Sequence, residues 1–293
     1  MIPNYEGNVP FEHLPFVSET MHSNEMGMQP RQDFMANQSH ITENMRSILV
    51  DWLVDVSVHF EVMGETLHYA INYIDRTLST IVIEKNKLQL VGVACMKIAD
   101  VFNERSKEYY RQENASEYAY ITADEYTPGE VIQMEKKILN VLNFELYSPT
   151  AVSFIKLMSQ VMELPPRVTV CANYLADLML LATNTHKHSP SLLASVYVFL
   201  AFIATEEDWP IEQRVAKCAK LCGHWYSQEE FEKAVDHVRV SWIDSRNNPN
   251  FSRFDAVNNK YEQYAAADVL NIRTLQPPLI ASRLLEKWIH LPS

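Results

Sequence analysis

Apolar residues between positions 43 and 61 recur with the period of an α-helix and fall on two opposite faces. At about 100° per residue, the broader face holds Met45, Ile48, Leu49, Trp52, Leu53, Val56 and Phe60, and the narrower stripe holds Val50, Val54 and Val58. A helix that is apolar on two faces packs on two sides. The pattern therefore predicts that this segment lies at the centre of an all-helical domain.

Three charged residues of this segment border its apolar faces. Arg46 lies beside Leu53, so a covered guanidinium would need a carboxylate partner. Asp75, at the end of the next apolar pattern, is the nearest acidic candidate, and we predict an Arg46–Asp75 ion pair. Asp51 and Asp55 border the opposite edge. Spacing alone leaves two interpretations of this edge open. Its residues are ordinary core and helix-surface residues, or they form a rim that accepts a leucine side chain together with a cationic one.

Further helical patterns follow along the chain. They cover about 65–79, 87–102, 128–142 and 192–204, with one more near 11–26 inside an N-terminal arm. We expect Phe11, Leu14, Phe16 and Met21 to dock this arm on the body. Thr42 and Ser189 are expected helix caps. Residues 103–121 are polar and predict a long connection with a short helix.

The same helix-start signals occur again after about one hundred residues. A capping box is predicted at Thr127 and Glu130, and again at Ser227 and Glu230, each at the start of an amphipathic helix. No strand-like alternation of useful length appears. We therefore predict an all-α tandem repeat with the division at 143–149, where Ser148 and Pro149 would open the next helix. The predicted parts are an arm (1–42), two helical repeats (43–146 and 147–250) and a C-terminal tail (251–293).

Composition and charge disfavour several classes of function. The 293 residues carry a formal net charge of −12, which disfavours nucleic acid as a partner and favours basic proteins or peptides. Only six glycines occur, and neither GxGxxG nor GxxxxGK is present, so no phosphate-binding loop is expected. No apolar run has the length of a membrane span. An intracellular protein without a membrane partner is therefore expected.

Cysteine and histidine residues offer little support for a metal or catalytic site. The four cysteines lie within apolar helical patterns, as expected of reduced thiols: Cys95, Cys171, Cys218 and Cys222. Cys218, Cys222 and His224 form a possible zinc set, but three candidate ligands without a second cluster are weak evidence. The other candidates for catalysis lack a nucleophile or a Gly-rich turn beside them: His59, His68 and His237. We expect neither metal nor cofactor, and no enzymatic activity.

Residues 45–55 (MRSILVDWLVD) resemble the opening helix of the cyclin box. Six further motifs occur in the order found in mitotic A- and B-type cyclins: ETLH at 65–68, NYIDR at 72–76, LQLVG at 88–92, YIT at 120–122, ME at 134–135 and SPT at 148–150. The resemblance is dense over about 38–155. It is weaker beyond, where Asn259, Lys260 and Tyr261 resemble the family's tail.

The resemblance implies two five-helix cyclin boxes and a regulatory role, namely binding and activation of a cyclin-dependent Ser/Thr kinase during the cell cycle, in the nucleus, the cytoplasm or both. Kinase contacts are expected from the helices at 87–102 and 128–142, through Leu90, Lys97, Phe102, Glu104 and Glu135. One position departs from the family. Val101 stands where cyclins usually carry a lysine that donates to kinase carbonyl groups, and Lys97 is a substitute one turn earlier.

Cyclins also dock substrates and inhibitors that carry an Arg-x-Leu motif on their opening helix. The matching positions here are Met45, Ile48, Leu49, Trp52, Asp55 and Gln89, the same edge that the spacing singled out. An apolar cleft would hold the leucine, and the carboxylate at its rim would hold the arginine.

Three other readings remain open. A transcription-associated cyclin fold would grip DNA or a polymerase, although the acidic charge counts against the DNA-binding form. An enzyme is a second alternative, with the histidines above as its weak candidates. A cyclin-like adaptor with altered or absent kinase activation is the third, and Val101 motivates it.

Overall fold

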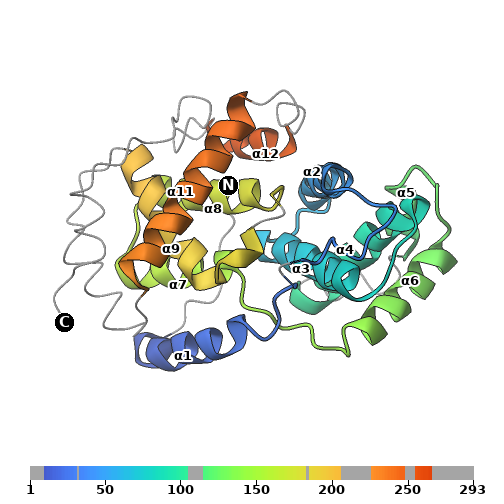
Figure 1. The fold of residues 1–293 in the computed structure, drawn as a ribbon, viewed down its shortest axis with the longest axis horizontal. Coiled ribbons are helices and arrows are strands. Elements are labelled where there is room, and N and C mark those ends of the chain that lie inside the picture. The colour runs from blue at the N-terminus through green and yellow to red at the C-terminus, as the bar shows by residue number, and fades with distance from the viewer. Residues whose placement is uncertain are drawn as a thin grey trace. The chain divides into compact units, whose positions relative to one another are not determined.

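The computed structural model describes residues 10–31, 33–104, 115–182, 185–205, 226–247 and 255–265. Within these ranges every regular element is a helix (Figure 1), and none is long and apolar enough to cross a membrane. The first half holds η1 (Phe11–His13), α1 (Leu14–Glu25), α2 (Glu43–His59), α3 (Gly64–Thr80), η2 (Lys85–Lys87), α4 (Leu88–Asn103), α5 (Ala115–Tyr120) and α6 (Pro128–Val141). The second half holds α7 (Ala151–Met162), α8 (Pro166–Met179), η4 (Thr185–Lys187), α9 (Pro190–Ala204), α11 (Gln228–Asn247) and α12 (Ala256–Ala265). The all-α prediction is confirmed.

The helices form two compact units. The N-terminal unit contains α2 to α6 and comprises Gly27–Ser148 together with Leu180–Lys187. The C-terminal unit comprises Met1–Met26, Pro149–Met179 and His188–Ser293. Each unit therefore includes a short piece of chain from outside its own half of the sequence, which the hydrophobic periodicity did not predict.

The central helix of the N-terminal unit is α4, because it contacts α2, α3, α5 and α6. The sequence predicted a central position for α2, and that prediction was wrong. Only one side of α2 is fully covered: Val50, Val54 and Leu53 are completely buried, whereas Ile48 is 53% exposed. The covered side takes residues from both predicted apolar faces, since Leu53 belongs to the broader face together with Ile48, so the pattern alone did not distinguish buried from exposed positions.

Helix starts follow the predicted capping chemistry. The hydroxyl of Thr42 accepts a hydrogen bond from the Met45 N–H and caps α2. Thr127 forms the predicted capping box with Glu130 at α6. In the C-terminal unit, Ser189 caps α9 through the Leu192 N–H, and the Ser227 and Glu230 side chains bond each other's backbone N–H groups at α11. These predictions are confirmed because capping depends on local sequence.

The start of α7 differs from the prediction. Thr150, rather than Ser148 and Pro149, is its N-cap, and the Thr150 side chain bonds Ser153 reciprocally in a capping box. Ser148 is instead buried, with its hydroxyl 3.4 Å from the Met28 carbonyl oxygen. The Ser-Pro pair looked like a helix start, but the later Thr150 satisfies the free N–H groups of the first turn.

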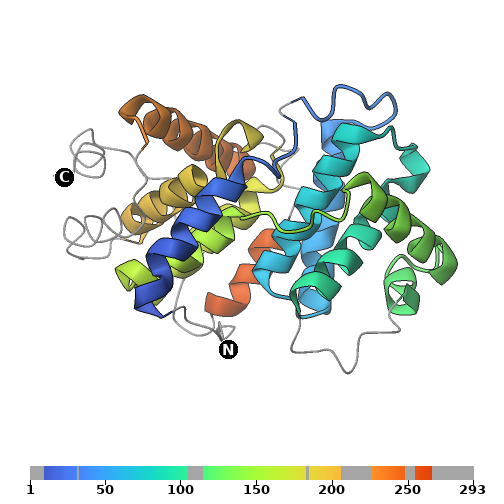
Figure 2. The same ribbon diagram turned by 90° about the horizontal axis from the view of Figure 1, so that it is seen from below.

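The C-terminal unit is built around α9, which contacts α1, α7, α8 and α11. Figure 2 shows α1 alongside α9. Leu14 and Met21 bury the apolar side of α1 as predicted, but Phe16 is 72% exposed, so its predicted role in docking the arm was wrong. The side chain of Phe11 lies outside the described residues. A single apolar stripe on a short helix leaves side chains at other angles in solvent.

A buried carboxylate also holds α1 in place. Glu25 accepts hydrogen bonds from the Ser191 N–H at 2.9 Å and the Ser191 hydroxyl at 2.8 Å, in the first turn of α9. The His22 ring lies 3.1 Å from the same carboxylate. Because the N-terminal turn of a helix has free N–H groups and a positive dipole end, a carboxylate is favoured there. Tertiary contact thus gives α9 an additional cap from a distant part of the chain.

Candidate functional site

The predicted ion pair between Arg46 and Asp75 is present in the interior of the N-terminal unit. Arg46 Nε and Nη2 each lie 2.6 Å from a different oxygen of Asp75. The two side chains are only 1% and 0% exposed. A bidentate, fully desolvated pair of this kind fixes the relative orientation of α2 and α3, the helices that carry its two partners.

Further groups complete this cluster, and spacing had not predicted them. Arg46 Nη1 donates to the Leu180 carbonyl oxygen at 2.8 Å, and the Ser47 hydroxyl donates to the Leu181 carbonyl oxygen at 2.8 Å. The His186 Nε2 atom lies 3.0 Å from Asp75 Oδ2. Leu180, Leu181 and His186 are thereby held against α2 and α3. Their sequence separation of more than one hundred residues left no local signal.

The electrostatics of the cluster favour the charged carboxylate. Burial alone would raise the pKa of Asp75, but the Arg46 charge and the hydrogen bonds from His186 and Arg46 outweigh it and hold this pKa below its ordinary value. Asp75 therefore remains ionised although it has no contact with solvent. The pair is therefore a buried, charged link between α2 and α3 within the N-terminal unit.

The first candidate surface is the docking patch, which consists of Met45, Ile48, Leu49, Trp52, Asp55 and Gln89. Five of these residues lie on one face of α2, and Gln89 comes from the first turn of α4, which packs against α2. Ile48 is exposed, Met45 and Trp52 are half-buried, and Leu49 is buried as the floor. An apolar side of α2 is thus partly exposed, and α4, which carries Gln89, packs against the same helix.

Close approach of α2 and α4 depends on a glycine beneath the docking patch. A Cβ atom at Gly92 would lie 2.7 Å from Leu49 Cδ1, which is closer than carbon atoms normally approach. The absence of a side chain at Gly92 allows Leu49 to sink to the floor of the patch. The position of Leu49 is therefore coupled to the spacing of the two helices.

Asp55 supplies the carboxylate of the docking patch. It is exposed on α2, three residues after Trp52, and partial desolvation raises its pKa above the ordinary value. Coulomb attraction to a cation beside this carboxylate would offset part of the solvation energy that the carboxylate has lost. The patch therefore combines an apolar side with a negative charge at one end, which fits an apolar residue followed or preceded by a basic one.

The second candidate surface is the α4–α6 face, which carries Lys97 and Val101 on α4 and Glu135 on α6. Lys97 Nζ lies 2.9 and 2.8 Å from the two carboxylate oxygens of Glu135, and both side chains are largely covered. Val101, one turn after Lys97, is 61% exposed. The position that departs from the family thus presents an apolar side chain to solvent beside a preformed ion pair.

The other residues expected to contact a kinase lie further inside. Leu90 is buried, and Phe102 is half-buried with its ring edge-on to Tyr69. Glu104 is also buried, where it accepts hydrogen bonds from the Met63 N–H and the Thr66 hydroxyl at 2.6 Å each. These three side chains hold α4 against its neighbours. Their contribution to partner binding stays a prediction, and it would act through the position of α4.

The described residues contain no cluster of three or more histidine, cysteine or acidic side chains arranged to hold a metal. Cys218, Cys222 and His224, the weak zinc candidates, lie outside the described residues. Cys95 and Cys171 are buried free thiols. Burial, with the Asp75 charge added, raises the pKa of Cys95 well above its ordinary value, so this thiol is a poor nucleophile.

Comparison with known proteins agrees with this architecture. The model of the cyclin N-terminal domain matches residues 17–147, and that of the cyclin C-terminal domain matches residues 149–277. A solved structure of a viral cyclin from herpesvirus saimiri superposes with a TM-score of 0.59, covering 85% of this chain and 99% of that one at 19% identity. That likeness concerns the fold.

Relatives of known sequence include A-type cyclins. Cyclin-A2 of Gallus gallus is 38% identical over 205 residues, or 69% of this chain and 50% of the relative. The G2/mitotic-specific cyclin-A of Patella vulgata is 33% identical over 279 residues, or 94% of this chain and 59% of the relative. The chain spans about half the length of these relatives. With both cyclin domains matched in tandem and an all-helical fold in two units, the chain belongs to the cyclin family.

Proposed function

We propose that this chain is the regulatory subunit of a cyclin-dependent Ser/Thr protein kinase and acts in cell-cycle progression, in the nucleus, the cytoplasm or both. The α4–α6 face is the observation that carries the proposal. Its residues Lys97 and Val101 belong to α4 and Glu135 to α6, the two helices that correspond to those cyclins use against the kinase, and Val101 is exposed there. The relationship to A-type cyclins supports the same role.

The mechanism would be a population shift in the kinase. A rigid partner surface that binds the active arrangement of the kinase more tightly than the inactive one raises the active fraction by the ratio of the two affinities. The α4–α6 face is suited to this task because its helices are fixed by packing and by the Lys97–Glu135 pair before any partner arrives. The groups that transfer the phosphoryl group would all belong to the kinase.

The second part of the proposal assigns Arg-x-Leu recognition to the docking patch. Trp52 and Ile48 offer apolar surface for the leucine, and Asp55 offers a carboxylate for the arginine. The raised pKa of Asp55 supports this assignment, since a desolvated carboxylate gains from an arriving cation. Substrates or inhibitors held there would reach the bound kinase at a high effective concentration.

Reconstitution with purified catalytic subunits tests kinase activation. The full chain is mixed with each of several cyclin-dependent kinases, and phosphate transfer to histone is compared with that of each kinase alone. Activation of at least one kinase is expected. A chain that binds a kinase without activating it would favour an adaptor, and a chain that binds none would refute the proposal.

A separate binding experiment tests the docking patch. An Arg-x-Leu peptide is titrated against the wild type, Trp52→Ala and Val58→Ala. Val58 is also an exposed apolar residue of α2 but is not part of the patch. Trp52→Ala should weaken binding about tenfold or more, as expected for a central aromatic contact, whereas Val58→Ala should leave it unchanged. Equal affinities for all three proteins would exclude docking at this surface.

A cyclin-like adaptor with little kinase activation is the second candidate. The exposed Val101 favours it, because a valine has no donor for the carbonyl groups that a lysine would reach. Lys97 is bound by both oxygens of Glu135, but an ammonium group has three N–H donors. A third donor is therefore still compatible with kinase binding. The same reconstitution distinguishes the two candidates.

A further inference from the structure

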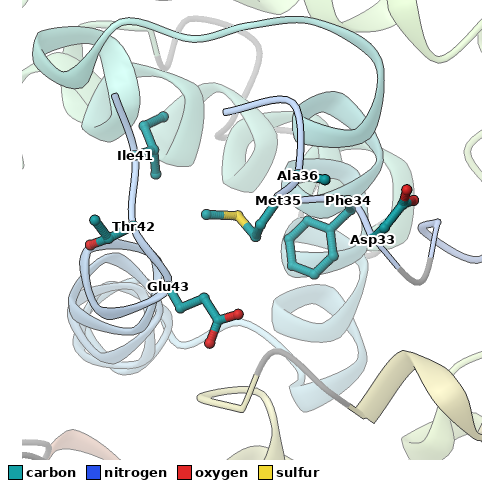
Figure 3. Close-up of a pocket in the computed structure, with 7 residues that line it drawn as sticks. All are labelled: Asp33, Phe34, Met35, Ala36, Ile41, Thr42 and Glu43. Atoms are coloured by element: carbon teal, nitrogen blue, oxygen red, sulfur yellow. The ribbon is translucent and has the colours of Figure 1, made fainter. Parts of the chain in front are cut away.

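A cavity of about 450 Å³ lies between the arm segment and the start of α2 in the N-terminal unit (Figure 3). Its lining comes from two short stretches, with Asp33, Phe34, Met35 and Ala36 on one side and Ile41, Thr42 and Glu43 on the other. The volume is within the usual range for ligand sites, roughly 300 to 1,000 Å³. None of its lining residues belongs to the docking patch or to the α4–α6 face.

The apolar residues at the base of the cavity pack against buried neighbours. Phe34 is 2% and Ile41 is 4% exposed. The Phe34 ring meets the His186 ring edge-on, with centroids 5.1 Å apart, and Arg46 Cζ lies 5.6 Å from its centroid. The cavity floor is therefore part of the Arg46–Asp75 cluster. Because that cluster is buried and hydrogen-bonded, the floor is in place before a ligand arrives.

Met35 provides an adaptable surface above this floor. Its side chain is half-buried and reaches across the opening toward the Ile41–Thr42 stretch (Figure 3). A thioether chain has three rotatable bonds and is polarisable, so it can repack around apolar groups of different shape. An aliphatic side chain of a ligand would thus find Met35, Phe34 and Ile41 as its surroundings.

The polar part of the cavity is acidic. Glu43 begins α2 and points toward the opening (Figure 3). Thr42 already caps this helix, so the Glu43 carboxylate is not required as a cap, and no ion pair joins it to another side chain within the described residues. Asp33 is exposed at the other end, 3.4 Å from Arg31 Nε. The chain as a whole carries −12, which attracts basic partners.

We infer that this cavity binds a basic peptide segment in which a leucine-sized apolar residue is followed by lysine or arginine. The apolar side chain would contact Met35 and Phe34, and the cation would reach Glu43. This site is separate from the docking patch: nine residues at about 100° each place Trp52 on the opposite side of α2 from Glu43. It therefore offers a second point of attachment for a basic partner.

Methyl NMR of the full chain tests this inference directly. The methionine methyl groups are labelled with ¹³C, and the Met35 signal is assigned from a Met35→Leu variant. The probe is the peptide Gly-Ser-Gly-Leu-Lys-Lys-Gly-Ser-Gly, which lacks an Arg-x-Leu motif. We expect the probe to shift the Met35 methyl signal in a saturable manner, and a peptide with glutamate in place of both lysines to leave it unmoved.

Two charge reversals provide the matched comparison. Glu43→Lys should weaken the probe about fivefold or more, since it replaces an attraction with a repulsion. Glu117→Lys makes the same charge change at an exposed residue of α5 outside the cavity and should leave affinity within about twofold. The Met45 methyl signal reports on the docking patch and should remain unmoved by the probe in every variant.

Several outcomes would overturn the inference. These are an unshifted Met35 signal at saturating peptide, equal weakening by Glu43→Lys and Glu117→Lys, or loss of the shift in Trp52→Ala, which would move the contact to the docking patch. The methyl spectra verify that each variant is folded. Kinase activation plays no part in these measurements, so this inference and the proposed function can fail independently.

Discussion

Removing Arg46 alone should destabilise the N-terminal unit more than removing Arg46 and Asp75 together. Arg46→Leu leaves the Asp75 carboxylate 0% exposed, with His186 as its remaining side-chain contact from this cluster. A buried charge that has lost its partner costs about 3–5 kcal/mol. The same substitution also removes the hydrogen bond to the Leu180 carbonyl oxygen. The single variant thus combines a desolvated charge with an unsatisfied acceptor.

The double variant Arg46→Leu/Asp75→Leu removes both charges. Replacing a buried ion pair with apolar residues is often close to neutral, so the remaining cost comes from the unsatisfied Leu180 carbonyl and is about 1–3 kcal/mol. We therefore expect a coupling energy of at least ~2 kcal/mol between the two positions. With a urea dependence of about 2 kcal/mol per molar, the single variant lowers the unfolding midpoint of this unit by roughly 2 M.

A probe confined to the N-terminal unit is needed, because two units need not unfold together. Trp52 is the one tryptophan of the sequence within 27–148 and 180–187, so ¹⁹F NMR of 5-fluorotryptophan at this position follows that unit. Lys87→Leu is the control, since it breaks the half-exposed Lys87–Glu130 pair and should cost less than about 1 kcal/mol. If Arg46→Leu shifts the midpoint no more than Lys87→Leu does, or if the double variant costs the sum of its singles, the reasoning is refuted.

Three further predictions concern other parts of the chain. Burial raises the pKa of Glu25, but the hydrogen bonds with His22 and Ser191 outweigh this effect and leave the pKa below its ordinary value of 4.5. The charged form of Glu25 is therefore the one that stabilises the docked α1. Docking of α1 should be favoured above about pH 4.5 and lost as the pH falls through the lowered pKa. Hydrogen exchange of the α1 amides, corrected for intrinsic rates, should show this dependence in the wild type and a pH-independent, faster exchange in Glu25→Gln. Lys97→Ala should weaken kinase binding about fivefold, as expected for loss of a charge-assisted hydrogen bond, and Val101→Lys should strengthen it. Calorimetric titration measures both affinities. A wild-type affinity for Lys97→Ala would exclude Lys97 as the substitute lysine. Gly92→Ala forces Leu49 to move, but it gains about 0.5–1 kcal/mol of helix propensity. The free energy of unfolding should therefore change by less than about 1 kcal/mol, while the affinity for an Arg-x-Leu peptide falls. An unchanged affinity would show that Leu49 adapts without disturbing the docking patch.

Local sequence rules predicted most helices and their caps. The capping boxes of Thr127 and Ser227 and the cap at Thr42 are confirmed because the groups involved lie within one turn of each other. Errors arose where two local signals competed. Ser148 with Pro149 resembled a helix start, but Thr150 has the free hydroxyl and the Ser153 partner that the first turn needs.

Periodicity correctly found the apolar positions of α2 but did not show which of them are covered. Val50 and Val54 are buried while Ile48 is exposed, and every one of these residues is an ordinary core residue by type. Packing against α3 and α4, with Gly92 beside Leu49, decides which of these positions are covered, and the covered positions come from both predicted faces. The same limit applied to Phe16, which is apolar and lies on a docked helix, yet remains in solvent.

The sequence by itself determined the helical class, the tandem organisation and most helix caps, and it named Asp75 as the nearest candidate partner of Arg46. These follow from periodicity, capping chemistry and the cost of an unpaired buried charge, all of which act over short distances or through strict requirements of charge. Tertiary structure alone decided that His186 and the Leu180 carbonyl join that ion pair, that Glu25 caps α9, and that Met35 and Glu43 line one cavity. Each of these contacts joins segments whose meeting depends on how whole helices pack, and no local pattern in the chain encodes that geometry.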